Sequence, residues 1–149
     1  MTGFSATERG NEEHARLQKI EWLDGVPDSE LPEYLREPSP LRDALRKPVG
    51  AIDLWRERAF EILHEGKWIS GVFDRVVFFE GRADIYDFKT NRKQQGETGA
   101  QFEERMAREY ASQMGSYRLA ISRLCTLPES AIRANLLLIE TRAVLPVFI

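Results

Sequence analysis

Residues 68–90 read WISGVFDRVVFFEGRADIYDFKT, and this stretch decides the fold. Two runs rich in β-branched and aromatic residues, 68–79 and 83–90, flank Glu80-Gly81, a pair typical of a tight turn. The pattern predicts two strands joined as an antiparallel hairpin. A third extended run, 52–63, precedes them and meets the turn signal Glu65-Gly66. We therefore expect a three-stranded antiparallel meander.

Outside the meander, helical and extended patterns alternate. Residues 7–22 have the spacing of a helix, and residues 23–50 carry five prolines that divide them into turns and short helices such as 31–36 and 41–46. Residues 91–100 are polar and glycine-containing, as in a mobile loop, while 101–125 is helical by pattern. Two further strands are expected at 132–139 and 143–149. The fold class is α/β (α+β), with a central mixed sheet of about five strands flanked by helices.

Length and composition limit the function classes. The chain has 149 residues, 42% of them hydrophobic and 30% charged, which predicts one globular domain: a helical segment at 1–50 and a sheet-and-helix core at 51–149. No apolar run could span a membrane. Cys125 is the single cysteine, which excludes a four-cysteine iron–sulfur cluster within the chain and fits a reducing cytoplasm. No phosphate-binding loop for ATP is present.

The meander carries residues suited to metal-assisted chemistry. Because side chains alternate along a strand, Asp87 and Lys89 share one face, and Asp74 on the neighbouring strand can reach them. Two carboxylates in an apolar neighbourhood are unfavourable unless a cation joins them, and hard oxygen ligands suit Mg²⁺ or Mn²⁺. The Asp-x-Lys triplet by itself fits a salt-bridged surface strand equally well. The net charge of −3 also argues against a simple DNA-binding module without metal.

Four short segments, in order, resemble the motifs of the RecB-type nuclease domain, a branch of the PD-(D/E)xK superfamily found in helicase–nucleases such as the RecB and AddA subunits. The segments are Arg9-Gly10-Asn11-Glu12-Glu13-His14, Gly71-Val72-Phe73-Asp74-Arg75, Tyr86-Asp87-Phe88-Lys89-Thr90 and Tyr110-Ala111-Ser112-Gln113-Met114-Gly115-Ser116-Tyr117. They correspond to the family's Gly-x-x-x-His, Gly-x-x-Asp-Arg, Asp-Tyr-Lys-Thr and Gln-x-x-x-Tyr motifs. The resemblance implies a restriction-endonuclease-like core.

The resemblance also implies roles for single residues. It implies that His14, Asp74, Asp87 and the backbone carbonyl of Phe88 are metal ligands. Catalytic roles fall to Asp74, Asp87, Lys89, Gln113 and Tyr117, and Glu57 is similar to an acidic position on the family's first strand. The expected activity is a Mg²⁺- or Mn²⁺-dependent deoxyribonuclease, an exonuclease of DNA repair and recombination, with DNA and a helicase domain or helicase subunits as partners.

Each role has an alternative in the sequence. His14 could be a half-buried, hydrogen-bonded histidine, and Tyr110 is expected to belong only to the apolar face of its helix. Arg92, Lys93, Arg105 and Arg108 could contact phosphates or form a solvated surface. The rival function is a non-catalytic DNA-binding or scaffolding module that keeps the nuclease fold within a helicase assembly.

Overall fold

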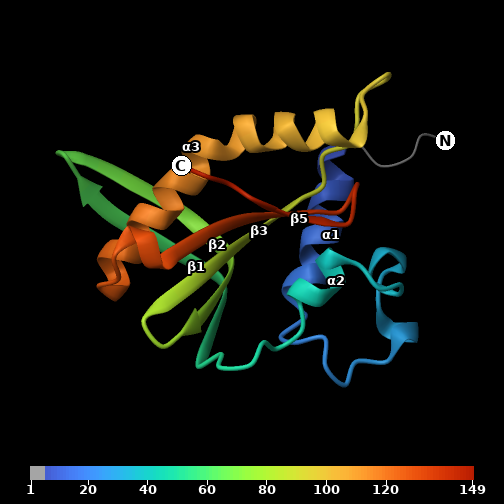
Figure 1. Ribbon diagram of the computed structural model, residues 1–149, viewed down its shortest axis with the longest axis horizontal. Helices are drawn as coiled ribbons and strands as arrows, with labels where there is room; N and C mark the ends of the chain where they lie inside the picture. Colours follow the sequence, from blue (N-terminus) through green and yellow to red (C-terminus); the bar gives the residue numbers. More distant parts are fainter. Residues whose placement is uncertain (1–5) are drawn as a thin grey trace.

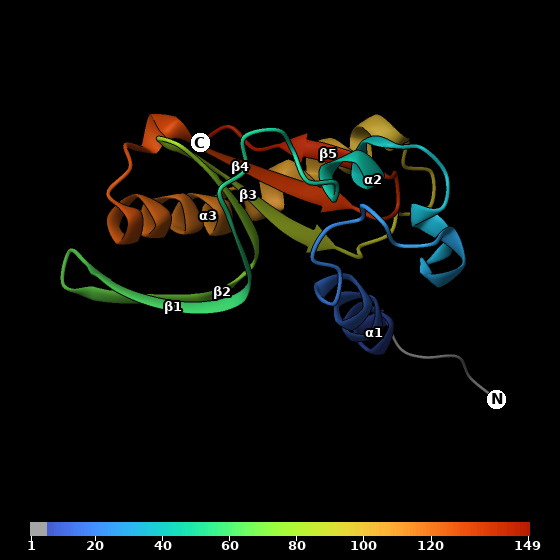
Figure 2. The ribbon, with the colours of Figure 1, turned by 90° about the horizontal axis from the view of Figure 1, so that it is seen from below.

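The computed structural model describes the backbone of residues 6–149, with the side chains of residue 10 and residues 12–149. One twisted sheet carries the long helix α3 across one face, while the N-terminal helices gather near the other (Figures 1 and 2). The elements follow in the order α1 (Ala6–Gln18), η1 (Asp28–Glu30), η2 (Glu33–Leu35), α2 (Pro40–Ala44), β1 (Asp53–His64), β2 (Lys67–Phe79), β3 (Arg82–Lys89), α3 (Gly99–Cys125), η3 (Glu129–Ala131), β4 (Ile132–Leu138) and β5 (Ala143–Pro146).

The sheet has the strand order β1-β2-β3-β4-β5. β1, β2 and β3 are antiparallel, which confirms the predicted meander. β4 then lies parallel to β3, and β5 returns antiparallel to β4. Parallel neighbours need a crossover connection, and α3 supplies it. The predicted mixed sheet flanked by helices is therefore confirmed.

The helix α3 begins two residues earlier than the sequence pattern indicated. The Thr98 hydroxyl accepts a hydrogen bond from the Gln101 backbone amide, and the Gln101 side-chain oxygen accepts one from the Thr98 backbone amide, a capping box that fixes the start of the helix. Its buried side chains, from Phe102 to Ile121, lie on one side of the helix and face the sheet. They form the larger core together with one face of β1–β4.

The N-terminal segment forms a second, smaller core on the opposite face of the sheet. Five buried leucines of the proline-rich region and Leu17 of α1 pack against Phe88 and Leu137: Leu23, Leu31, Leu35, Leu41 and Leu45. The helix α1 ends at Gln18 rather than at the predicted residue 22, because the carbonyls of Ile20 and Glu21 bind the side chain of Arg75 from the sheet. Among residues 6–149, no helix is long and apolar enough to cross a bilayer.

Candidate active site

The candidate site lies where β1 and β2 share an interruption. Strand pairs run through Arg56↔Arg75 and resume at Arg58↔Phe73, so Glu57 and Asp74 are skipped together. Glu57 has a φ of 47°, the left-handed region that costs a non-glycine residue about 1–3 kcal/mol. Side-chain alternation is reset at this point, since Phe73 and Val76, three residues apart, both reach the larger core. Because of this interruption, the carboxylates of Glu57 and Asp74 do not occupy the positions of a regular strand pair.

A second opening separates β2 from β3. Their last pair toward the site is Arg75↔Tyr86, while β3 continues beside β4 as far as Lys89. The Phe88 amide faces the opening and donates to Asp74 Oδ2 over 2.9 Å. In a parallel ladder the N–H and C=O of one residue point to the same side, so the Phe88 carbonyl also faces the opening. Its oxygen lies 3.1 Å from His14 Nε2.

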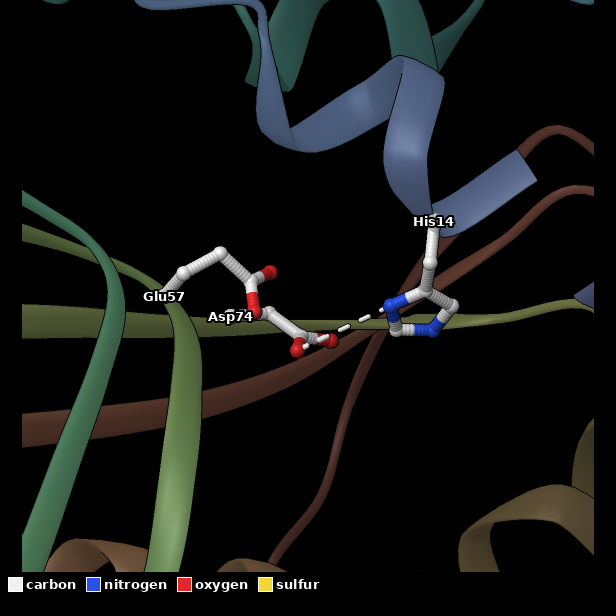
Figure 3. A group of neighbouring side chains, drawn as sticks. All are labelled: His14, Glu57 and Asp74. Carbon is white, nitrogen blue, oxygen red and sulfur yellow. Dashed lines mark ion pairs between the residues drawn. The ribbon is translucent and has the colours of Figure 1, made fainter. Parts of the chain in front are cut away.

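His14 reaches the site from α1. Its Nδ1 lies 3.8 Å from Asp74 Oδ1, and one ligand atom each of His14, Glu57 and Asp74 all lie within 4.8 Å of one another (Figure 3). Gly10 explains how α1 comes so close: a Cβ at this position would lie 2.9 Å from Thr90 Oγ1. A glycine one turn before His14 therefore lets the helix approach the end of β3.

The other half of the site is a chain of polar contacts between β3 and α3. Lys89 Nζ lies 2.7 Å from Asp87 Oδ2 and donates to Gln113 Oε1 over 3.0 Å. Gln113 in turn donates to the Tyr117 hydroxyl over 3.3 Å. Lys89 Nζ also lies 3.9 Å from the centre of the Tyr110 ring, a cation–π contact. Three side chains thus contact one ammonium group, and Tyr117 helps to position one of them, Gln113.

Gly71 makes room for Tyr117. A Cβ on this glycine would lie 3.0 Å from ring atoms of both Phe60 and Tyr117. The Tyr117 ring also packs edge-on against Phe60 and Phe73. The first glycines of two sequence motifs, Gly10 and Gly71, therefore have the same purpose, which is to let a helix lie close to a strand.

Burial and like charge dominate the electrostatics. Burial, then the negative charge of Asp87 and a hydrogen-bonding contact with its carboxyl, raise the pKa of Asp74 to about 9. Desolvation also raises the pKa of Glu57, opposed by His14 and aided by Asp87. Burial and the charges of Asp87 and Asp74 raise the pKa of Tyr117 to about 12. The cluster holds more negative charge than its own side chains neutralise.

The structure brings the predicted residues together in two adjoining groups. His14, Asp74 and the Phe88 carbonyl form one, and Asp87, Lys89, Gln113 and Tyr117 form the other. Glu57, which the resemblance compares with an acidic position on the family's first strand, belongs to the first group.

Three sequence expectations need correction. Tyr110, expected only on an apolar helix face, does pack against the larger core but also contacts Lys89 and exchanges hydrogen bonds with Asn91. Arg105, for which the sequence offered phosphate contact or a solvated surface, is instead ion-paired with Glu97 at 2.8 Å. That pair and the Glu140 carboxylate on the Lys93 amide tie down a loop expected to be mobile.

The fold and the site define a class of metal-dependent phosphodiesterases: a mixed sheet whose central strands carry two carboxylates and a lysine beside a helix that covers them. A family comparison agrees with this class, since the model of the PD-(D/E)XK nuclease superfamily matches residues 5–145. The chain belongs to the PD-(D/E)XK nuclease superfamily. Membership indicates a metal-dependent nuclease. No curated protein matches the sequence.

Proposed function

We propose that this domain is a Mg²⁺- or Mn²⁺-dependent deoxyribonuclease of the RecB/AddA type, with residues 1–50 supplying His14 and residues 51–149 the catalytic core. The observation that carries the proposal is the convergence of His14, Glu57 and Asp74 beside the Asp87–Lys89 pair. The four ordered motifs of the sequence support the RecB/AddA branch.

The donor set fits a divalent cation. If His14 Nε2 donates to the Phe88 carbonyl, the lone pair of Nδ1 faces Asp74 Oδ1 at 3.8 Å, and this pair of acceptors can bind a metal ion or, without one, the proton that Asp74 keeps. The raised pKa of Asp74 agrees with this, because its negative form is unfavourable here unless a positive charge lies beside it. We propose His14, Glu57, Asp74 and Asp87 as ligands. For the Phe88 carbonyl we propose the role of orienting the imidazole, in place of the ligand role implied by the resemblance.

A bound divalent ion would supply a polarised phosphate and an activated water. Lys89 contributes a fixed positive charge, because Asp87 and Gln113 accept from it and Tyr110 covers it. An ammonium held this way can donate to the attacking water or to a phosphate oxygen without reorganising. Tyr117 and Gln113 act through the position of Lys89, as the hydrogen bond between them indicates.

DNA needs a local positive surface on a chain of net charge −3. A groove between the end of α1 and β1 runs beside Glu57 and carries Lys19, Arg56 and Arg58 on its walls. The Arg58 guanidinium is held over the Trp55 ring, 4.3 Å from its centre. We propose this groove as the binding surface for the DNA backbone next to the cleaved bond.

The resemblance also suggests the setting. An exonuclease that works beside a helicase in DNA repair and recombination agrees with a chain that has no ATP-binding motif of its own. The cytoplasm remains the proposed location, since DNA is the proposed substrate. Whether this protein co-purifies with a helicase tests the proposed setting independently of the cleavage activity.

Cleavage assays with a matched buried carboxylate test the activity itself. Linear single- and double-stranded DNA is incubated with Mg²⁺ or Mn²⁺ and the wild type, Asp87→Asn, Lys89→Ala or Asp84→Asn. Asp84 is buried on the same strand but pairs with Arg82 instead of the site. The proposal expects cleavage by the wild type and by Asp84→Asn, and losses of about 100-fold or more in the other two. Equal nucleotide release by all four proteins, or none, would favour the scaffolding function.

A further inference from the structure

Arg75 is a buried arginine whose contacts are with the backbone of the N-terminal segment. Its side chain is 1% exposed, the largest among the fully buried side chains. Nη1 donates to the Ile20 carbonyl over 2.8 Å, Nη2 donates to the Glu21 carbonyl, and the guanidinium lies over the Trp22 ring. Both carbonyls belong to the turn that directly follows α1. Arg75 therefore holds the end of that helix against β2.

A second arginine does the same from the neighbouring strand. Arg56 is the cross-strand partner of Arg75, and its Nη1 donates to the Gln18 carbonyl over 2.9 Å. The last carbonyls of a helix lack intrahelical partners and carry the negative end of its dipole. Two cations from adjacent strands thus converge on the C-terminal end of α1.

The order of residues links these contacts to the metal site. Arg75 directly follows Asp74 on β2, and Arg56 directly precedes Glu57 on β1. His14 lies one helical turn before Gln18. Each strand that supplies a carboxylate therefore also hydrogen-bonds the end of the helix that supplies the imidazole. The distance from His14 to Asp74 and Glu57 depends on where these hydrogen bonds place α1.

Stability alone does not explain a buried arginine here. Burial, and then the charge of Arg56, lower the pKa of Arg75 to about 10. Its Nε has no hydrogen-bond partner, and within the described residues no carboxylate lies in ion-pair contact with it. An apolar side chain of similar volume would avoid this desolvation. Leu17 anchors α1 in the smaller core, and the Arg75 contacts fix the backbone that follows it.

We infer that Arg75, assisted by Arg56, is a positioning residue that sets the separation of His14 from Asp74 and Glu57 and thereby the affinity of the site for a divalent metal. The inference rests on the proposed metal site. Arg75 acts through α1 and touches neither metal nor substrate. Its geometric requirement is a planar fork whose two nitrogens each bind one carbonyl, a geometry that the single ammonium of lysine does not reproduce.

A double-mutant cycle on metal affinity tests the inference. The dissociation constant of Mn²⁺ is measured by calorimetry, without DNA, for the wild type, Arg75→Lys, His14→Ala and the double variant. Arg75→Lys should weaken binding by about tenfold, the size expected when a group that orients a ligand is lost. In the His14→Ala background the same change should have almost no further effect. Arg56→Lys should weaken binding less, because it replaces one hydrogen bond.

Arg42 is the matched control, since it also donates to backbone carbonyls, those of Leu35 and Arg36, but on a segment without site residues. Arg42→Lys should lower the melting temperature and leave the Mn²⁺ constant unchanged. Amide hydrogen exchange of the metal-free proteins should quicken in α1 for Arg75→Lys and stay unchanged there for Arg42→Lys.

Three outcomes overturn the inference. They are unchanged Mn²⁺ affinity in both Arg75→Lys and Arg56→Lys, an equal loss with and without His14, or an equal loss in Arg42→Lys. A wild type that binds no Mn²⁺ would instead overturn the proposed metal site, and the inference with it.

Discussion

Replacing Asp74 with asparagine should stabilise the metal-free protein, although it removes a proposed ligand. The pKa of Asp74 is raised from 3.8 to about 9. The folded protein therefore keeps a proton that the unfolded chain releases, and its free energy of unfolding falls as pH rises from about 4 to about 9. Asparagine carries no charge, can still accept from the Phe88 amide, and can donate to Asp87. The pH dependence should disappear with the carboxyl.

The size of the effect follows from the burial of Asp74, which is 8% exposed. A difference of one between folded and unfolded pKa values corresponds to about 1.4 kcal/mol. Buried carboxyls next to a second carboxylate reach differences of about 3, so Asp74→Asn should gain on the order of 4 kcal/mol at about pH 8. For a chain of this length 1 kcal/mol is about 2–4 °C, which gives a rise in melting temperature of about 8–16 °C.

Thermal unfolding in EDTA and in Mn²⁺, over a pH series, measures this directly. Near pH 4 the two proteins should melt alike, and their difference should widen as pH rises. Mn²⁺ at about 100 times its dissociation constant should add about 2.7 kcal/mol to the wild type and little to the variant, which narrows their difference near pH 8 to about 1 kcal/mol. Parallel melting curves at every pH, or an equal gain from Mn²⁺ in both, would refute the reasoning.

Three further predictions concern the surroundings of the site. Gly71→Ala should push against the Tyr117 ring, cost about 1–3 kcal/mol of unfolding free energy and lower the cleavage rate, as denaturant titration and cleavage kinetics can measure. His14→Ala should weaken the binding of Mn²⁺ more than that of Mg²⁺ in calorimetric titrations, because an imidazole nitrogen favours Mn²⁺ over Mg²⁺. An equal loss of affinity for both ions would place the nitrogen outside the coordination sphere. Lys19→Gln with Arg58→Gln should raise KM for DNA, leave kcat unchanged and reduce the slope of log affinity against log salt by about two, and an unchanged slope would exclude the groove.

The sequence predicts the parts of this molecule that depend on local patterns. β-branched runs and two Glu-Gly turns predict the meander, and period two along β3 predicts that Asp87 and Lys89 share a face. The spacing of Gln113 and Tyr117 by one helical turn predicts their common direction. These predictions succeed because neighbours in the sequence determine each of them.

The remaining features depend on contacts between distant segments. Nothing about Glu57 in the sequence indicates a positive φ, because glutamate has no preference for that conformation. Tyr110 gains its contact with Lys89 only when α3 crosses the sheet. The early end of α1 depends on arginines 38 and 55 residues away along the chain. Helix periodicity alone predicts four residues too many for that helix.

A crystal structure with Mn²⁺ and an uncleaved DNA oligonucleotide tests the central claim most directly. The anomalous signal of manganese marks the ion without reference to the protein. The account predicts a peak within about 2.3 Å of Asp74 oxygen and a ring nitrogen of His14, with a DNA phosphate oxygen as a further ligand and Lys89 beside that phosphate. A peak elsewhere, or DNA bound with no ion between Asp74 and the phosphate, would contradict it.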